Sequence, residues 1–174
     1  LHHASANQAS LEVVERLLTA YPEGAKEKDK NSKLALHHAS ANQASLEVVE
    51  RLLSAYPDGV KEKDEESKLA LHHAIEGKAS LELVERLLAL YPEGTKEKST
   101  HYSTNGMLPL HIATKNQALL EVVEKLLASN PDGVKEKDKD SKLPLHHASA
   151  NQASLEVVER LLTAYPDGAK EKDK

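Results

Sequence analysis

The chain has 174 residues but no Phe, no Trp, one Met and five Tyr, so it has little material for one large aromatic core. Its formal charge is −5, and its 23 basic and 28 acidic residues alternate instead of forming the basic face of a nucleic-acid-binding protein. No apolar run approaches the roughly 20 residues that cross a membrane. Without cysteine, the chain has no disulfide framework and no thiolate metal site. We therefore expect thin layers rich in Leu, Val and Ala, with no membrane insertion and no nucleic-acid partner.

An internal repeat begins at Leu1 and recurs at Leu36, Leu71, Leu110 and Leu145. Residues 1–35 and 36–70 differ at only five positions, and residues 145–174 differ from 1–30 at one. A period of this length is typical of stacked repeat architectures. The sequence predicts a single array over residues 1–174, with repeats at 1–35, 36–70, 71–109, 110–144 and 145–174.

Each repeat is expected to contain two helices. The first is short and is typified by Leu-Pro-Leu-His-His-Ala at 143–148, where Pro144 suits the first helical turn. After a polar Asn-Gln-Ala turn, Ser45 is placed to cap a second helix that begins near residue 46. The apolar residues of this second helix follow the three-and-four spacing of one buried face, and they are Leu46, Val49, Leu52, Leu53 and Tyr56.

The end of the second helix is marked by Pro57, and Gly59 is expected to take the left-handed conformation common beyond helix ends. From Val60 an extended, charged segment is expected, as a long loop or a weak hairpin. The tyrosines at the helix ends, Tyr21, Tyr56, Tyr91 and Tyr165, are interpreted as core residues. Asn130 takes their place in the fourth repeat, where it should loosen or polarise the seam.

The order Leu-Pro-Leu-His-x-Ala, polar turn, Leu-Glu-Val-Val-x-x-Leu-Leu and charged segment resembles the ankyrin repeat over the whole chain. The resemblance implies an all-α solenoid of five ankyrin-like helix-turn-helix repeats, with long charged connecting loops or hairpins. It also implies a non-enzymatic scaffold for protein–protein interaction. The repeats depart from the family in their 35-residue length and in the serines Ser32, Ser67 and Ser141, which replace a loop glycine.

In ankyrin arrays, loop tips and exposed short-helix residues of the concave surface bind the partner. Mapped by position, the resemblance places the partner-binding surface on every connection of this chain. The most specific part is expected around the third repeat and the segment 99–107, which is four residues longer than its counterparts, although such a loop can also be merely tolerated. The candidate residues are Lys30, Asn31, Lys33, Glu65, Glu66, Lys68, Glu76, His101, Tyr102, Asn105, Met107, Lys115, Lys139, Asp140 and Lys142.

Paired histidines, such as His37-His38 and His72-His73, raise the question of a metal site. Adjacent helical residues point about 100° apart and stacked helices lie roughly 8–10 Å apart, so these imidazoles are not expected to converge on one ion. The first His of each pair matches the ankyrin His, which in that family forms a structural hydrogen-bond ladder. The second His is expected to be partly buried and to titrate near neutral pH.

Catalysis is not expected, because His, Ser and Glu recur at equivalent positions of every layer and do not form one unique constellation. No nucleotide-binding, zinc-protease or hydrolase motif is present. We therefore predict no catalytic residue, no cofactor and no metal, and the sequence assigns no cellular compartment.

An alternative function rests on residues 1–30 and 145–174, which carry the same apolar residues as interior repeats instead of polar caps. The chain could be part of a longer array. It could also be a structural, self-assembling protein whose copies stack head to tail into filaments. The expected partners are thus another protein or further copies of the chain.

Overall fold

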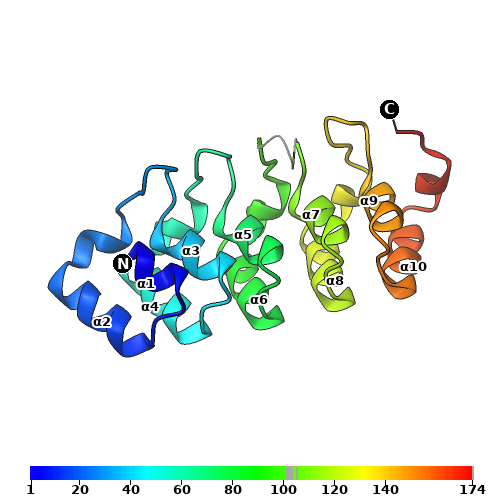
Figure 1. Cartoon of the computed structure of the whole chain (residues 1–174). Coiled ribbons are helices and arrows are strands. Elements are labelled where there is room, and N and C mark those ends of the chain that lie inside the picture. Colours follow the sequence, from blue (N-terminus) through cyan, green and yellow to red (C-terminus); the bar gives the residue numbers. More distant parts are fainter. Residues whose placement is uncertain (101–103, 105, 174) are drawn as a thin grey trace. The chain divides into compact units, whose positions relative to one another are not determined.

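The computed structural model describes residues 1–100, 104 and 106–173, and these residues form ten α-helices and no strand (Figure 1). The all-α prediction is confirmed. Short and long helices alternate along the chain, so that each short helix is followed by a long one. The helices are α1 (His2–Ala6), α2 (Leu11–Ala20), α3 (Ala35–Ala41), α4 (Leu46–Ala55), α5 (Ala70–Glu76), α6 (Leu81–Leu90), α7 (Pro109–Lys115), α8 (Leu120–Ser129), α9 (Pro144–Ala150) and α10 (Leu155–Ala164).

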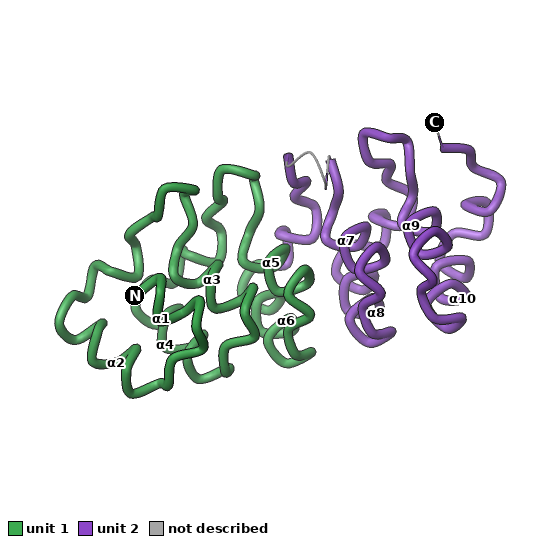
Figure 2. Tube along the Cα trace, viewed as in Figure 1, with its two compact units in different colours: residues 1–91 green, residues 92–174 purple. Residues whose placement is uncertain are grey.

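The chain divides into two compact units, Leu1–Tyr91 and Pro92–Lys174 (Figure 2). In the first unit, the short helices α1, α3 and α5 pack in one row, and the long helices α2, α4 and α6 pack in a second row. In the second unit, α7 packs on α9 and α8 packs on α10 in the same manner. The two rows of each unit enclose its core. That all the repeats form one continuous array stays a prediction.

The long helices bury most of the face that the apolar spacing predicts, although Leu46 and Tyr56 are only half-buried. In α4, Val49, Leu52 and Leu53 are buried while Glu47 is exposed. Val48, which the spacing left out, is buried as well, because α4 has neighbours on two sides, α2 and α6. A fully buried Val or Leu side chain contributes about 1.5–3 kcal/mol, so these faces dominate the stability of each layer.

The helix ends differ in part from the expectations. Pro109 and Pro144 occupy the first turns of α7 and α9, as the sequence predicts. The hydroxyls of Ser80 and Ser154 accept hydrogen bonds from backbone N–H groups in the first turns of α6 and α10. Ser45, the predicted cap of α4, makes no such bond to the helix backbone.

A 3₁₀ helix, which the sequence pattern does not predict, follows each long helix. These helices are η1 (Pro22–Ala25), η2 (Pro57–Lys61), η3 (Pro92–Lys96), η5 (Pro131–Val134) and η6 (Pro166–Lys170).

Two predictions at this point of the repeat are therefore wrong. Val60 lies inside η2 and does not begin an extended segment. Gly59 is not left-handed, because among the described glycines only Gly106 has a positive φ. Pro57 starts a new tight turn here as the first residue of η2, so the chain coils once more before it extends.

The connecting loops reverse without forming a strand in the described part of the chain. The N–H of Asp29 donates to the carbonyl of Lys33 at 2.9 Å, and the N–H of Asp64 donates to that of Lys68 at 3.0 Å. Ser32, Ser67 and Ser141 adopt φ values of 59°, 58° and 62°, the left-handed conformation that glycine otherwise favours. These serines thus take the same left-handed conformation as Gly106, whose φ is 73°. No helix within the described ranges is long and apolar enough to cross a membrane.

Candidate functional site

The loops are held at their base by a buried or half-buried aspartate. Asp64 accepts hydrogen bonds from the backbone N–H groups of Glu66 and Lys68, both at 2.9 Å, and from Nε2 of His73 at 2.8 Å. Asp29 and Asp138 make the same three bonds in their own loops. A side chain that binds the backbone two and four residues on fixes the turn. The loop tips are therefore presented on a preorganised base.

The charge of these aspartates is stabilised by the same hydrogen bonds. Burial alone would raise the pKa of Asp64, but the bonds from His73 and from the backbone of Lys68 and Glu66 outweigh burial and lower the pKa to about 2. The same balance of burial, the His38 bond and backbone bonds lowers the pKa of Asp29 to about 2. The carboxylates stay ionised at any physiological pH.

The first His of the pairs, and the single His111 at the same place of its repeat, form the predicted hydrogen-bond ladder inside each unit. Nδ1 of His37 accepts the N–H of Leu34 at 2.8 Å, so the proton is on Nε2, which donates to the carbonyl of Glu62 at 3.0 Å. His111 repeats this arrangement with Leu108 and Glu136. Burial, with a smaller contribution from a neighbouring His, lowers the pKa of both His37 and His111 to about 4. These neutral imidazoles connect a short helix to the next loop through their two hydrogen bonds.

The second His of each pair stabilises the loop base. Nε2 of His38, His73 and His147 lies 2.8 Å from the Asp29, Asp64 and Asp138 carboxylates. Burial lowers the pKa of His147, although Asp138 opposes the shift. Acid titration of the second His as a class stays a prediction. Among the described residues, no group of three His, Asp or Glu side chains is placed to hold a metal ion.

The elongated connection keeps the loop base but changes its chemistry. Ser99 stands where the other loops have Asp, and its N–H donates to the carbonyl of Met107 at 3.0 Å. Its hydroxyl lies 2.8 Å from that of Thr104. Ile112, fully buried, stands where the Asp-paired His would be. Asp and His are thus replaced together, which avoids leaving either one buried without its partner.

The structure places the candidate partner-binding residues at three levels of exposure. Lys30, Glu65, Lys139 and Asp140 are exposed at the loop tips, and Asn31, Lys33, Glu66, Glu76, Lys115 and Lys142 are half-buried. Lys68 and Met107 are buried, at 5% and 4% exposure. The candidates His101, Tyr102 and Asn105 lie outside the described residues.

Three candidates of the second connection meet in one ionic cluster. Nζ of Lys68 lies 2.9 Å from a carboxylate oxygen of Glu66 and 2.9 Å from one of Glu76, although the Lys68 side chain is only 6% exposed. Burial would lower the pKa of Lys68, but its hydrogen bonds to Glu76 and Glu66 raise it. The cluster ties the loop tip to α5, so Lys68 positions its neighbours and offers little surface of its own.

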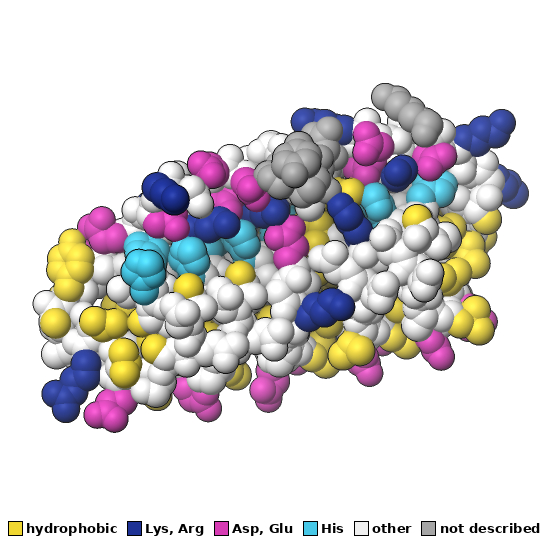
Figure 3. Space-filling view, in the orientation of Figure 1, with side chains coloured by type: hydrophobic (Ala, Val, Ile, Leu, Met, Phe, Trp, Pro, Cys, Tyr) yellow, Lys and Arg dark blue, Asp and Glu magenta, His cyan; other side chains and the backbone are white. Residues whose placement is uncertain are grey.

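Charges of both signs gather along the loop side of each unit, beside the histidine side chains (Figure 3). The tips differ in charge from loop to loop: Lys30-Asn31, then Glu65-Glu66, then Lys139-Asp140. The three tips stand on the same hydrogen-bonded base. The arrangement presents variable charges on a constant scaffold, which suits recognition of another macromolecule better than chemistry on a small substrate.

Pairs of helices packed layer on layer, with loops projecting along one side, define the helical repeat proteins. The model of the family described as ankyrin repeats (3 copies) matches residues 1–98 and 71–173. The chain belongs to the ankyrin repeat family, whose repeats generally mediate protein–protein interactions. No curated protein matches the chain significantly.

Proposed function

We propose that this chain is a non-enzymatic scaffold that binds a protein partner through its loop tips and the adjoining ends of its short helices. The observation that carries the proposal is where near-identical repeats differ. Of the five differences between residues 1–35 and 36–70, three are conservative: Thr19 to Ser54, Glu23 to Asp58, and Ala25 to Val60. The other two, Lys30 to Glu65 and Asn31 to Glu66, change the charge of the tip.

The rigid loop base supports this role energetically. Because Asp29 and Asp64 already hold their loops through backbone and His hydrogen bonds, a partner loses little free energy in ordering them. Charged side chains at the rim of an interface select the partner and speed its approach. A positive tip next to a negative tip, within one unit, favours a partner with the opposite order of charges.

The test begins with site-specific crosslinking of the full chain. A photoreactive residue at the Glu65 tip should capture a protein partner from an extract of the source organism, and the same residue at Glu12, exposed on α2, should not. The affinity of the purified partner is then measured by calorimetry. The double variant Glu65→Lys with Glu66→Asn should weaken binding about tenfold, the size expected for an interfacial charge contact.

This double variant gives the second tip the residues of the first, and Lys68, which loses its ion pair with Glu66, keeps the one with Glu76. Thr19→Ser, which likewise copies one repeat into another on an exposed site of α2, is the matched control and should leave the affinity unchanged. A partner captured equally at Glu12 and insensitive to the tip exchange would contradict the proposal.

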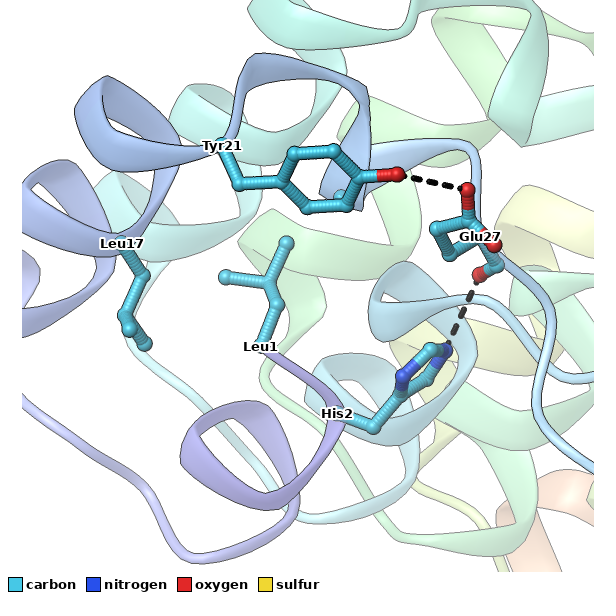
Figure 4. Close-up of a pocket in the computed structure, with 6 residues that line it drawn as sticks. Leu1, His2, Leu17, Tyr21 and Glu27 are labelled. Atoms are coloured by element: carbon cyan, nitrogen blue, oxygen red, sulfur yellow. Dashed lines mark hydrogen bonds between the residues drawn. The ribbon is translucent and has the colours of Figure 1, made fainter.

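A second candidate function, head-to-tail self-association, is favoured by the outer face of the first helix pair. Val13 and Leu17 are 45% and 39% exposed, whereas Val48 and Leu52, at the equivalent places of the second pair, are 2% exposed. This face is hollowed by about 260 Å³ beside Leu1 and Tyr21 (Figure 4). At the other end of the sequence, Leu155 of α10 is 67% exposed.

Because residues 145–174 nearly repeat 1–30, the pair α9 and α10 of one copy could pack on the first pair of another, as the first pair packs on the second. Light scattering across a concentration series tests this candidate. The mass should rise with concentration, and Leu17→Glu should abolish the rise. A strictly monomeric species at every concentration would exclude it.

A further inference from the structure

Three of the tyrosines that follow long helices have the same surroundings, which we call the tyrosine seat. The hydroxyls of Tyr21, Tyr56 and Tyr165 donate to the carboxylates of Glu27, Glu62 and Glu171, each six residues later, at 3.0, 3.2 and 3.4 Å. Figure 4 shows this arrangement for Tyr21, whose ring lies beside Leu1 and points at Glu27.

Each ring also lies close to the glycine three residues after it, in the 3₁₀ helix. A Cβ atom on Gly24, Gly59 or Gly168 would come within 3.2, 3.2 or 3.1 Å of the ring. The seat therefore consists of the glycine backbone, which lies against one side of the ring, and the glutamate carboxylate, which binds the hydroxyl. The predicted role of these tyrosines as core residues is only partly right, because Tyr21 is 54% exposed and the described others are half-buried.

In the second helix pair, the surroundings of the Tyr56 ring also include an apolar side chain and a lysine from the preceding loop. Leu34 lies 3.4 Å from the Cβ position of Gly59, and Nζ of Lys28, from the preceding loop, lies 2.7 Å from the Glu62 carboxylate. Burial raises the pKa of Tyr56, and the hydrogen bond to Glu62 raises it further. The seat thus favours a neutral, hydrogen-bonded phenol.

The fourth helix pair has the same walls but no tyrosine. A hollow of about 320 Å³ lies at this place, within the second unit. Counted from their repeats, its lining residues occupy the places of Lys26, Lys28, Leu34, Tyr56, Asp58 and Glu62. The lining residues are Lys96, Lys98, Leu108, Asn130, Asp132 and Glu136.

The other features of the seat are preserved around Asn130. Nζ of Lys98 lies 2.9 Å from the Glu136 carboxylate, as Lys28 does from Glu62. Gly133 takes the place of Gly59, and Leu108 lies 3.6 Å from its Cβ position. The Asn130 amide lies against Gly133, with Nδ2 3.0 Å from the Cβ position of that glycine, and donates to the carbonyl of Thr95 at 3.3 Å. An amide is too short to reach Glu136, so this carboxylate faces the hollow, where Lys98 is its ion-pair partner.

We propose that this hollow binds a tyrosine side chain supplied by a protein partner. The ring would lie against Leu108 and the Asn130 amide, and its hydroxyl would donate to Glu136, as the chain's own tyrosines do at Glu27, Glu62 and Glu171. The entrance is open, since the side chains of Lys96 and Asp132 are 57% and 87% exposed. Aromatic side chains are effective anchors because they bury a large area at a low cost in conformational entropy. This inference rests on the proposed role in protein binding and names one anchor of the partner.

The test uses the isotope-labelled full chain, titrated with N-acetyl-tyrosine amide and followed by NMR. Saturable shifts are expected at Lys98, Leu108, Gly133 and Glu136. N-acetyl-phenylalanine amide, which lacks the hydroxyl, should bind about tenfold more weakly, the ratio expected for losing one hydrogen bond to a charged group. Absence of saturable shifts with the tyrosine probe, or equal binding of both probes, would overturn the proposal.

Two variants test whether the probe binds in the hollow at Asn130. Asn130→Tyr restores the residue of the other repeats, fills the seat with the chain's own ring and should abolish binding of the probe. Tyr56→Asn empties the equivalent seat of the second pair and should create a second binding site, with new shifts around Gly59. Binding that survives Asn130→Tyr would assign the probe to another surface and overturn the proposal.

The two proposals fail separately. The tip exchange at Glu65 and Glu66 lies outside the hollow, so it should leave probe binding unchanged while it weakens the whole partner. If the tip exchange weakens the partner but Asn130→Tyr does not, the scaffold function stands and the tyrosine site is refuted.

Discussion

At the scale of single residues, the loop aspartates are the groups on which the candidate surface depends. Asp64 is 6% exposed and satisfies two backbone N–H groups and one imidazole. Asp64→Ala leaves these buried donors without an acceptor, so we expect the free energy of unfolding to fall by about 2–4 kcal/mol. Urea denaturation measures the loss. Asp140→Ala, at an exposed loop tip, is the control and should change the stability by less than about 0.5 kcal/mol. Equal losses would show that the loop base does not stabilise the fold.

The ladder histidines make stability depend on pH in a defined window. The pKa of His37 and of His111 is lowered to about 4 in the folded state, against 6.5 when unfolded. Their contribution is therefore complete above pH 6.5 and is lost as the pH falls towards 4, because the unfolded state binds protons first. Over this pH range, each of the two histidines should lower the free energy of unfolding by about 3 kcal/mol.

Thermal melts followed by circular dichroism between pH 7.5 and 4 should show this loss. Asp29 and Asp64, whose pKa values are lowered from 3.8 to about 2, lose their contribution progressively below about pH 5, so the part of the window between pH 6.5 and about 5 reports on the histidines. His3→Gln, which changes an exposed His, should leave the pH profile unaltered. An unchanged melting curve between pH 6.5 and 4 would contradict the prediction.

At the scale of elements, the sequence predicts the long helices well, because their apolar spacing directly encodes one buried face. The 3₁₀ helices were missed because Pro and Gly after a helix also mark a simple stop, and the choice between stop and tight turn depends on packing. η2, for example, contacts both α4 and α5. Local sequence carries no information about such contacts, which form only when the layers stack.

The position of the candidate surface could be predicted from the sequence, but the contacts among its side chains could not. The loop tips follow from the repeat pattern, whereas the burial of Lys68 between Glu66 and Glu76 depends on how the loop folds onto α5. The Asp–His pairs do leave a signal in the sequence, a constant spacing of nine residues, as in Asp64 and His73. At Asn130 the sequence predicts only looser or more polar packing. The replacement of a tyrosine by asparagine indicates a binding site only when the residues around the absent ring are known.

The first turns of the short helices can be improved by copying one element into another. Leu34 and Leu69 have φ and ψ near −80°, 163° and −86°, 167°, the extended conformation that also precedes Pro109 and Pro144. Ala35→Pro and Ala70→Pro should therefore each raise the free energy of unfolding by about 0.4–1 kcal/mol.

Chemical denaturation measures these gains, and they should add in the double variant, since the two turns are separate. Ala39→Pro, in the body of α3, is the opposite control and should cost about 3 kcal/mol or more. A loss of stability at Ala35 would mean that the proline ring does not fit against the buried neighbours of α3.

At the scale of the whole molecule, the place of a helix within its unit decides what its residues contribute to stability. Leu17 and Leu52 lie in the identical sequence Leu-Glu-Val-Val-Glu-Arg-Leu-Leu, yet Leu17 is 39% exposed and Leu52 is 2% exposed. The difference arises because α4 is covered by α2, whereas the outer face of α2 is open in this structure. Matched substitutions at the two sites therefore measure what one covering layer adds.

We expect Leu52→Ala to lower the free energy of unfolding by about 2–5 kcal/mol, since it leaves a cavity in a closed core. Leu17→Ala should lower it by about 1 kcal/mol at low protein concentration, because much of its side chain is already hydrated. If copies stack on this face, the cost of Leu17→Ala should rise with concentration towards that of Leu52→Ala, because binding to the folded state adds to stability. A cost at Leu17 that equals that of Leu52 even in dilute solution would show that the first face is already covered within the monomer.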